Sequence, residues 1–380
     1  MIQHRRLPVS RLLSTLVRPL DPTLLLILVA LLTYSAILIE SAAPELFTKQ
    51  VTFILLSLLG MWIMAAIPTR RLLSLAPLAY IAGIALLVAV HLFGVTSKGA
   101  QRWLELGPIH RFQPSEIMKI VVPLALAWFF QKREHSISWL EFLIALLLVA
   151  APAYLIIKQP DLGTAILVCS AGFFVIFFAG FPWKLIVPFA LVGAVIIFSI
   201  FAFGDHLCQP GVKWIGMHDY QKARVCTLLD PNRDPLGKGF HTIQSTIAIG
   251  SGGFTGKGWK QGTQTHLAFL PERHTDFIFA VLSEEFGLIG VLTLLGLYMA
   301  LLARGFLIAA TAPTLGGKLF ASAMTMVFFT YLFVNIGMVS GILPVVGVPL
   351  PFMSYGGTAI VTLCLGVGIL MGVRRNVQER

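Results

Sequence analysis

Apolar runs of about 17 to 20 residues alternate with short polar segments along nearly the whole chain. A helix of that length can cross the hydrocarbon core of a bilayer, and it satisfies its own backbone groups there. The alternating pattern of a membrane β-barrel does not occur in the sequence. We therefore predict an all-α, polytopic integral membrane protein with about ten transmembrane helices. The predicted spans are 23–40, 51–67, 75–93, 116–130, 139–157, 163–181, 185–203, 277–304, 319–338 and 358–373.

The positions of lysine and arginine predict the orientation of these spans. Two of the short outer loops offer only Lys49 and Lys158, and the outer loop before the last span has no Lys or Arg. Basic residues favour the cytoplasmic side, so both termini are expected to be cytoplasmic. Residues 1–20 then form a cytoplasmic basic tail, and 204–275 form a large periplasmic loop before the eighth span of a single transmembrane domain. The inner loops contain Arg70 and Arg71, Lys132 and Arg133, Lys184, Arg304 and Lys318, and finally Arg374, Arg375 and Arg380.

Composition supports this class and limits the partners. Of 380 residues, 57% are hydrophobic and 12% charged, which excludes an ordinary soluble domain. The net charge of +11 is typical of basic cytoplasmic loops beside anionic headgroups, and we find no motif for nucleic acid. The cysteines lack metal-ligand spacing. Cys208 and Cys226 both fall in the predicted outer loop, where a disulfide between them can form but is not required.

The segments that resemble functional motifs all fall in the predicted outer loops 94–115, 158–162, 204–275 and 339–357, whereas the inner loops are short and basic. The protein is therefore expected to work at its outer face. The Pro- and Gly-rich run 343–357 predicts an irregular or re-entrant segment, which is tolerated at membrane depth only against protein or water. The Gly-rich run 250–258 is rejected as a nucleotide loop, because Ser251 and Gly258 occupy positions where such a loop needs Gly and Ser or Thr.

The loop around Trp103 breaks the inside-positive trend, since Lys98, Arg102 and Arg111 all lie outside. Contact with lipid headgroups explains such residues, and taken alone that interpretation is favoured. The alternative is a site for a phosphate-bearing ligand, for which arginine is well suited.

Carboxylates near the ends of spans also allow two interpretations. Glu116 and Lys119 are three residues apart on one helix face, which favours a mutual ion pair. Asp161 at the start of a helix is most simply a cap. Asp276 fits the same description, but Glu284 and Glu285 follow it down the same helix. Together they form an acidic stripe that enters the membrane, and such stripes usually mark a site or an ion path.

Several long, ordered motifs are spread over nearly the whole chain. They are Lys98-Gly-Ala-Gln-Arg-Trp103, Arg111-Phe-Gln-Pro-Ser-Glu116, Gln159-Pro-Asp-Leu-Gly-Thr164, Pro271-Glu-Arg-His-Thr-Asp-Phe-Ile-Phe-Ala280, Asn335 to Pro351, and Ser354-Tyr-Gly-Gly357. Together they resemble the SEDS family (shape, elongation, division and sporulation proteins), and its elongation members more than its division members. The stretch 204–216 is extra length compared with those members.

The resemblance implies a peptidoglycan glycosyltransferase that polymerises lipid II on the outer face of a bacterial cytoplasmic membrane. It implies a class B penicillin-binding protein and other elongation-complex membrane proteins as partners. The family's catalytic aspartate matches Asp276, and its functional tryptophan matches Trp103. The further residues expected to contact substrate are Lys98, Arg102, Arg111, Gln113, Glu116, Lys119, Asp161, Glu285 and Ser354.

The implied chemistry suits these residue types. Displacing a lipid diphosphate requires a base for the acceptor hydroxyl, here Asp276, and positive charge on the leaving group. Arg102, Lys98 and Arg111 are candidates for that charge, and a divalent cation (Mg or Mn) could assist them. A lipid II flippase is the rival function, although a transporter should show polar detail on both faces. An inactive scaffold would leave the acidic stripe unexplained.

Overall fold

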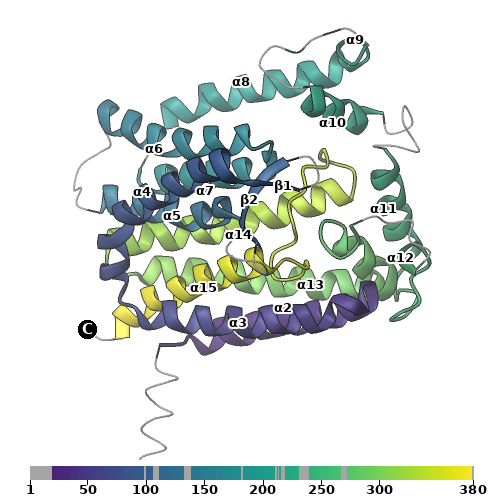
Figure 1. Cartoon of the computed structure of the whole chain (residues 1–380), viewed down its shortest axis with the longest axis horizontal. Coiled ribbons are helices and arrows are strands. Elements are labelled where there is room, and N and C mark those ends of the chain that lie inside the picture. Colours follow the sequence, from purple (N-terminus) through teal and green to yellow (C-terminus); the bar gives the residue numbers. More distant parts are fainter. Residues whose placement is uncertain are drawn as a thin grey trace, which may run out of the picture.

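The computed structural model describes residues 19–97, 100–105, 111–131, 138–180, 183–209, 212, 214, 219–230, 239–266 and 272–378. The predicted basic tail, apart from its last two residues, and Lys98 lie outside this part of the chain. Ten helices of 17 or more residues occur within it, in the order predicted, and most of them run side by side (Figure 1). They are α2 (Pro22–Ala42), α3 (Phe47–Ala66), α4 (Thr69–Phe93), α5 (Pro114–Phe130), α6 (Trp139–Lys158), α7 (Leu162–Phe178), α8 (Trp183–Ala202), α13 (Ile278–Thr311), α14 (Leu315–Val339) and α15 (Gly357–Gln378).

The class predicted from the sequence is confirmed: this is a polytopic helical membrane protein. Among the described residues, seven helices are long and apolar enough to cross a membrane, namely α2, α3 with the 3-10 turn before it (Pro44–Leu46), α4, α6, α13, α14 and α15. α7 is apolar but shorter. α14 lies centrally against α5, α7 and α13, and it is the most buried of the seven.

Side chains in the sequence define several helix starts. Asp21 accepts a hydrogen bond from Leu24 N at 2.9 Å and so caps α2. Ser138 and Glu141 form a reciprocal capping box at the start of α6. Such caps satisfy backbone N–H groups that have no partner within the helix.

One feature of the fold was not predicted. The segment between α4 and α5 forms a small antiparallel sheet of β1 (Val95–Ser97), β2 (Ala100–Glu105) and β3 (Arg111–Phe112), so this predicted outer loop is not entirely irregular. The strands are too short for sequence periodicity to reveal them.

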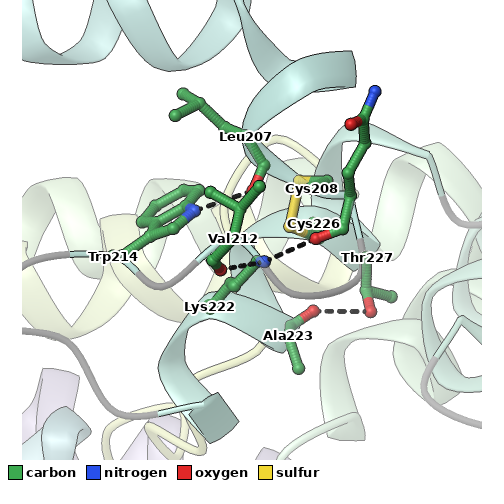
Figure 2. Close-up of a disulfide and its surroundings, with 9 residues drawn as sticks. Leu207, Cys208, Val212, Trp214, Lys222, Ala223, Cys226 and Thr227 are labelled. Atoms are coloured by element: carbon green, nitrogen blue, oxygen red, sulfur yellow. Dashed lines mark hydrogen bonds between the residues drawn. A yellow bond between two sulfur atoms is a disulfide. The ribbon is translucent and has the colours of Figure 1, made fainter.

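In the long loop between α8 and α13, the described residues form four short helices: α9 (Gly204–Leu207), α10 (Asp219–Leu229), α11 (Phe240–Ser251) and α12 (Thr263–His266). They lie towards one end of the bundle, and the C-terminus lies at the other (Figure 1). We call these the loop end and the C-terminal end. A disulfide joins Cys208, just after α9, to Cys226 in α10, as Figure 2 shows.

α13 is interrupted at Gly287, whose φ of 62° and ψ of −157° are not helical. The Gly-rich run packs against this break: Lys257 N donates to Glu284 O at 3.0 Å, and Leu288 N donates to Gly253 O at 3.0 Å. A Cβ on Gly256 would lie 2.1 Å from Glu285 O, so this close backbone approach requires glycine. The run therefore has a structural explanation, in keeping with its rejection as a nucleotide loop.

An ion cluster joins three helices at the C-terminal end. Asp21, at the start of α2, pairs with Arg304 of α13 at 2.8 Å and with Arg374 of α15. Burial raises the pKa of Asp21, but hydrogen bonds from Arg304, Leu24 N and Arg374 outweigh it and hold the pKa below its ordinary value. The cluster therefore keeps its charges paired at neutral pH.

Candidate active site

A cavity of about 960 Å³ at the loop end is formed by segments far apart in the sequence. Its walls come from β2, the first turns of α5 and α7, the residues just before α13, and the segments 347–349 and 355–365. Seven of the predicted site residues line it: Arg102, Trp103, Gln113, Glu116, Lys119, Asp161 and Asp276.

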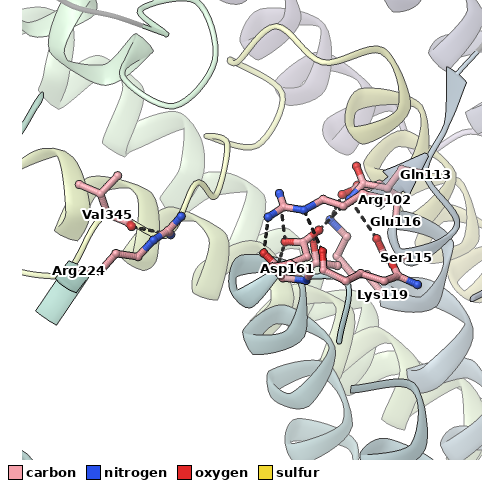
Figure 3. A network of polar contacts seen from close by, with 11 residues as sticks. Arg102, Gln113, Ser115, Glu116, Lys119, Asp161, Arg224 and Val345 are labelled. Carbon is pink, nitrogen blue, oxygen red and sulfur yellow. Dashed lines mark hydrogen bonds and ion pairs between the residues drawn. The ribbon is translucent and has the colours of Figure 1, made fainter. Parts of the chain in front are cut away.

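Asp161 is the centre of a buried polar network on one wall (Figure 3). It caps α7 by accepting from Thr164 N at 3.2 Å, as the simpler interpretation predicted. Its second oxygen accepts from Gln113 Nε2 at 2.8 Å and from Thr164 Oγ1 at 2.9 Å. The carboxylate therefore fixes the first turn of α7 relative to the start of α5.

Arg102 holds the turn that precedes α7. Its guanidinium donates to the carbonyl oxygens of Gln159, at 3.3 Å, and of Pro160. It also lies 3.9 Å from Asp161, and its side chain is 31% exposed at the cavity. The residue thus has a structural role and still faces the space in which a ligand would bind.

Glu116 and Lys119 form the predicted ion pair, with Lys119 Nζ 2.6 Å from Glu116 Oε1. Lys119 is 2% exposed and also donates to the hydroxyl of Tyr331, from α14. Glu116 Oε2 is buried and has no hydrogen-bond partner among the described residues. A buried acceptor at a cavity wall is suited to a donor on a ligand or to a cation.

Asp276 lies in the turn just before α13. The helix N-cap is Phe277, so Asp276 stands one residue outside the capping position. Its backbone carbonyl accepts from Asn335 Nδ2 at 2.9 Å. A Cβ on Gly347 would lie 3.5 Å from Asp276 Oδ2, which places the carboxylate beside the backbone of the facing wall.

Aromatic contacts hold the turn that carries Asp276. The His241 ring of α11 stacks on Phe277 with centroids 5.8 Å apart. The His274 ring meets Tyr355 edge-on, also at 5.8 Å. Burial lowers the pKa of His241, and the nearby charge of Glu272 opposes this shift. The histidines of the long loop that contact this turn therefore act in packing.

Other predicted residues lie elsewhere or cannot be placed. Glu285 accepts a hydrogen bond from Ser41 of α2 and does not line the cavity. Ser354 is buried and donates to Thr275 O at 2.6 Å, so it supports the turn before α13 without facing the cavity. Lys98 lies outside the described residues, and for Arg111 the structure describes only the backbone.

The irregular segment after α14 fits its prediction: residues 344–350 form no regular structure and supply the wall 347–349. Asn335 joins this wall to Asp276, since it also donates to Val348 O at 2.7 Å. The sequence analysis included Asn335 only as the first residue of a family motif, with no role of its own, and it did not include Tyr331. The available signal was a polar side chain within a central apolar helix.

A metal ion would have to be held largely by its ligand. Among the described residues, no group of three or more His, Cys, Asp or Glu side chains is arranged to bind one. The Asp276 and Glu116 carboxylates do line one cavity. Mg²⁺ is commonly held by one or two carboxylates together with substrate phosphates, so a carboxylate of this cavity suits a cation that arrives with a phosphate-bearing ligand.

Comparison with known families identifies the class of protein. Residues 11–379 match the family of cell cycle proteins that comprises FtsW, RodA and SpoVE. The match spans nearly the whole chain, and the protein belongs to this family.

Individual relatives agree with this assignment. The chain is 54% identical over 358 residues to the peptidoglycan glycosyltransferase MrdB of Escherichia coli K12, covering 93% of both chains. It is 36% identical over 348 residues to MrdB of Helicobacter pylori, covering 90% of this chain and 87% of that one.

Solved structures show the same fold. A chain of a peptidoglycan synthase complex that coordinates polymerization and crosslinking superposes with a TM-score of 0.78 at 35% identity, covering 95% of this chain and 99% of that one. The rod shape determining protein RodA of Thermus thermophilus gives a TM-score of 0.69 at 31% identity, covering 94% and 97%.

Proposed function

We propose that this protein is a peptidoglycan glycosyltransferase that polymerises lipid II into glycan strands during cell elongation. The observation that carries the proposal is the cavity that brings Asp276 together with Arg102, Lys119 and Glu116. Relatives named peptidoglycan glycosyltransferase, one of them more than half identical over nearly the whole chain, support it.

Asp276 is the general base that removes the proton from the acceptor sugar hydroxyl. A carboxylate beside a cavity wall can accept that proton as the new glycosidic bond forms. The bond to the undecaprenyl diphosphate breaks in the same displacement, and negative charge develops on the departing diphosphate. Arg102 faces the cavity with part of its guanidinium and stabilises that charge.

The loop end faces the periplasm and both termini are cytoplasmic, in the inner membrane of a bacterium. Single cysteines at 240 or 260, in a protein with all four native cysteines replaced by serine, test this orientation in spheroplasts. An impermeant maleimide should label them before lysis. Labelling only after lysis would reverse the orientation.

The C-terminal end favours a transferase over a flippase. Asp21, Arg304 and Arg374 join α2, α13 and α15 there, and a transporter would have to separate such helices to open inwards. A class B penicillin-binding protein of the elongation machinery is the partner that supplies cross-linking. The structural likeness to a chain of a complex that couples polymerization to crosslinking supports this.

The decisive experiment is polymerisation of purified lipid II by the purified protein, with and without its penicillin-binding protein. Asp276→Asn preserves the size of the side chain but removes the base, and we expect polymerisation to fall by about 10²- to 10⁴-fold. Partner binding and thermal stability should stay near wild type. Polymerisation by Asp276→Asn at the wild-type rate would refute the assignment of the base.

A further inference from the structure

Asn335 is a primary amide in α14, the most buried of the seven candidate membrane spans, and it is 0% exposed. An amide at this depth costs free energy unless its N–H groups are hydrogen-bonded. Its position within an otherwise largely apolar helix therefore calls for a specific role.

Both bonds that it donates go to the backbone of the candidate active site. Nδ2 lies 2.9 Å from Asp276 O and 2.7 Å from Val348 O. Because both partners are carbonyl oxygens, the atom between them must be the amide nitrogen, whose two hydrogens match the two acceptors. One side chain thus joins the turn that carries Asp276 to the wall 347–349.

This junction lies beside the short distance between the Asp276 carboxylate and the backbone of the wall 347–349. The Asp276 carboxylate stands so close to the wall that a Cβ on Gly347 would come within 3.5 Å of Oδ2. α14 is packed against α5, α7 and α13, so it is a rigid base for the amide. A shift of the turn relative to the wall would move the carboxylate out of line with the acceptor hydroxyl.

We propose that Asn335 is a positioning residue for glycan polymerisation, which fixes the Asp276 carboxylate relative to the wall 347–349 without touching the substrate. The proposal rests on the proposed function. Asn335 is not among the described residues that line the cavity, so its removal should affect the rate of transfer and not the capture of lipid II.

Two substitutions test this. Asn335→Asp keeps the shape but has no N–H to donate, and Asn335→Leu removes the polar atoms. We expect kcat to fall about 10²-fold, the effect of misplacing a catalytic group by about 1 Å, while KM for lipid II stays near wild type. Thr325→Val is the matched control, because Thr325 is also 0% exposed in α14 and donates only to Ala321 O of its own helix in the described structure.

Thermal unfolding, gel filtration and lipid II binding are measured on the same preparations, with Asp276→Asn alongside. Folded Asn335 variants with low kcat, normal lipid II binding and a normal Thr325→Val enzyme support the proposal. It is overturned if either Asn335 variant polymerises at the wild-type rate while Asp276→Asn is inactive. Equal losses of binding and rate, or aggregation of both variants, would assign Asn335 to the fold and overturn it too. An active Asp276→Asn would refute the assigned base instead.

Discussion

The two acidic regions at the start of α13 look alike in sequence but differ in structure. Asp276 lies beside a cavity wall in a turn. Glu284 is 0% exposed and accepts hydrogen bonds from Lys257 Nζ at 2.7 Å and from the hydroxyl and backbone of Thr265. A carboxylate buried away from the cavity among donors of its own chain stabilises the fold, whereas one that lines a cavity is placed to act on a ligand.

This difference divides what the sequence presents as one acidic stripe. Glu284 joins α13 to the Gly-rich run and α12, and Glu285 joins it to α2 through Ser41. Changes at Asp276 should therefore alter the reaction, and changes at Glu284 should alter stability.

Among the changes that keep the charge of these carboxylates, the largest effect is expected from Asp276→Glu. The charge is kept, but the carboxylate moves by about one methylene, and a displacement of about 1 Å can cost about 10²-fold in rate. The reciprocal change Glu284→Asp should leave kcat near wild type and lower the unfolding temperature. Rates and melting curves of both variants check this, and an active Asp276→Glu with an inactive, stable Glu284→Asp would invert the comparison.

The sequence predicted the helices well because apolar length determines them. It placed the end of the eighth span at 304, whereas α13 continues to Thr311. Arg304 was read as a loop residue, but Asp21 neutralises it within the bundle. A charge marks the end of a helix only when no partner is available, and a partner 283 residues away is invisible in sequence.

Only part of the site was predicted, because contacts between residues far apart along the chain cannot be read from the sequence. Motifs identified Arg102, Asp161 and Asp276, and the structure brings them to one cavity. Glu285 was predicted with them because it belongs to the acidic stripe, but it accepts a hydrogen bond from Ser41 and does not line the cavity. Ser41 lies 244 residues away along the chain, so this contact cannot be read from the sequence.

Arg102→Ala should have the next largest effect. A hydrogen bond to a charged group contributes about 1.5–3 kcal/mol, so losing one to the diphosphate lowers kcat/KM by roughly 10- to 100-fold. Arg102→Lys should restore activity only in part, because a lysine cannot form a guanidinium's paired contacts. Lipid II kinetics of both variants measure this.

Arg102 also holds the turn before α7, so a control is needed. Gln159→Leu disturbs the same turn, because it removes the bond from Gln159 Nε2 to Leu87 O at 3.1 Å, and it leaves the guanidinium in place. If Arg102→Ala and Gln159→Leu lose the same activity, Arg102 acts through the turn alone and its contact with the diphosphate is disproved.

Glu284→Gln should act on stability. The glutamine amide has one oxygen to accept hydrogen bonds where the carboxylate has two, so its N–H groups face donors such as Lys257 and Thr265. A buried polar group left without a partner lowers the free energy of unfolding by about 1–3 kcal/mol. Glu40→Gln is the control: its pair with Lys260 is exposed, with side chains 39% and 42% accessible, and such pairs contribute about 0–1 kcal/mol. Thermal unfolding in detergent compares them, and equal shifts would show that the Glu284 network contributes nothing special.

The smallest effect on polymerisation is expected from the disulfide. Cys208–Cys226 closes a segment with a sequence separation of 18, and α10 reaches the site through Arg224, which donates to Val345 O at 2.7 Å. Val345 lies two residues before the wall at Gly347. The double change Cys208→Ser and Cys226→Ser should therefore increase hydrogen exchange across α10. It should reduce the polymerisation rate no more than about twofold, well below the 10²-fold cost of misplacing a catalytic group. Non-reduced peptide mapping of wild type must first show the bridge. A large loss of activity without the bridge would make α10 part of the active-site wall.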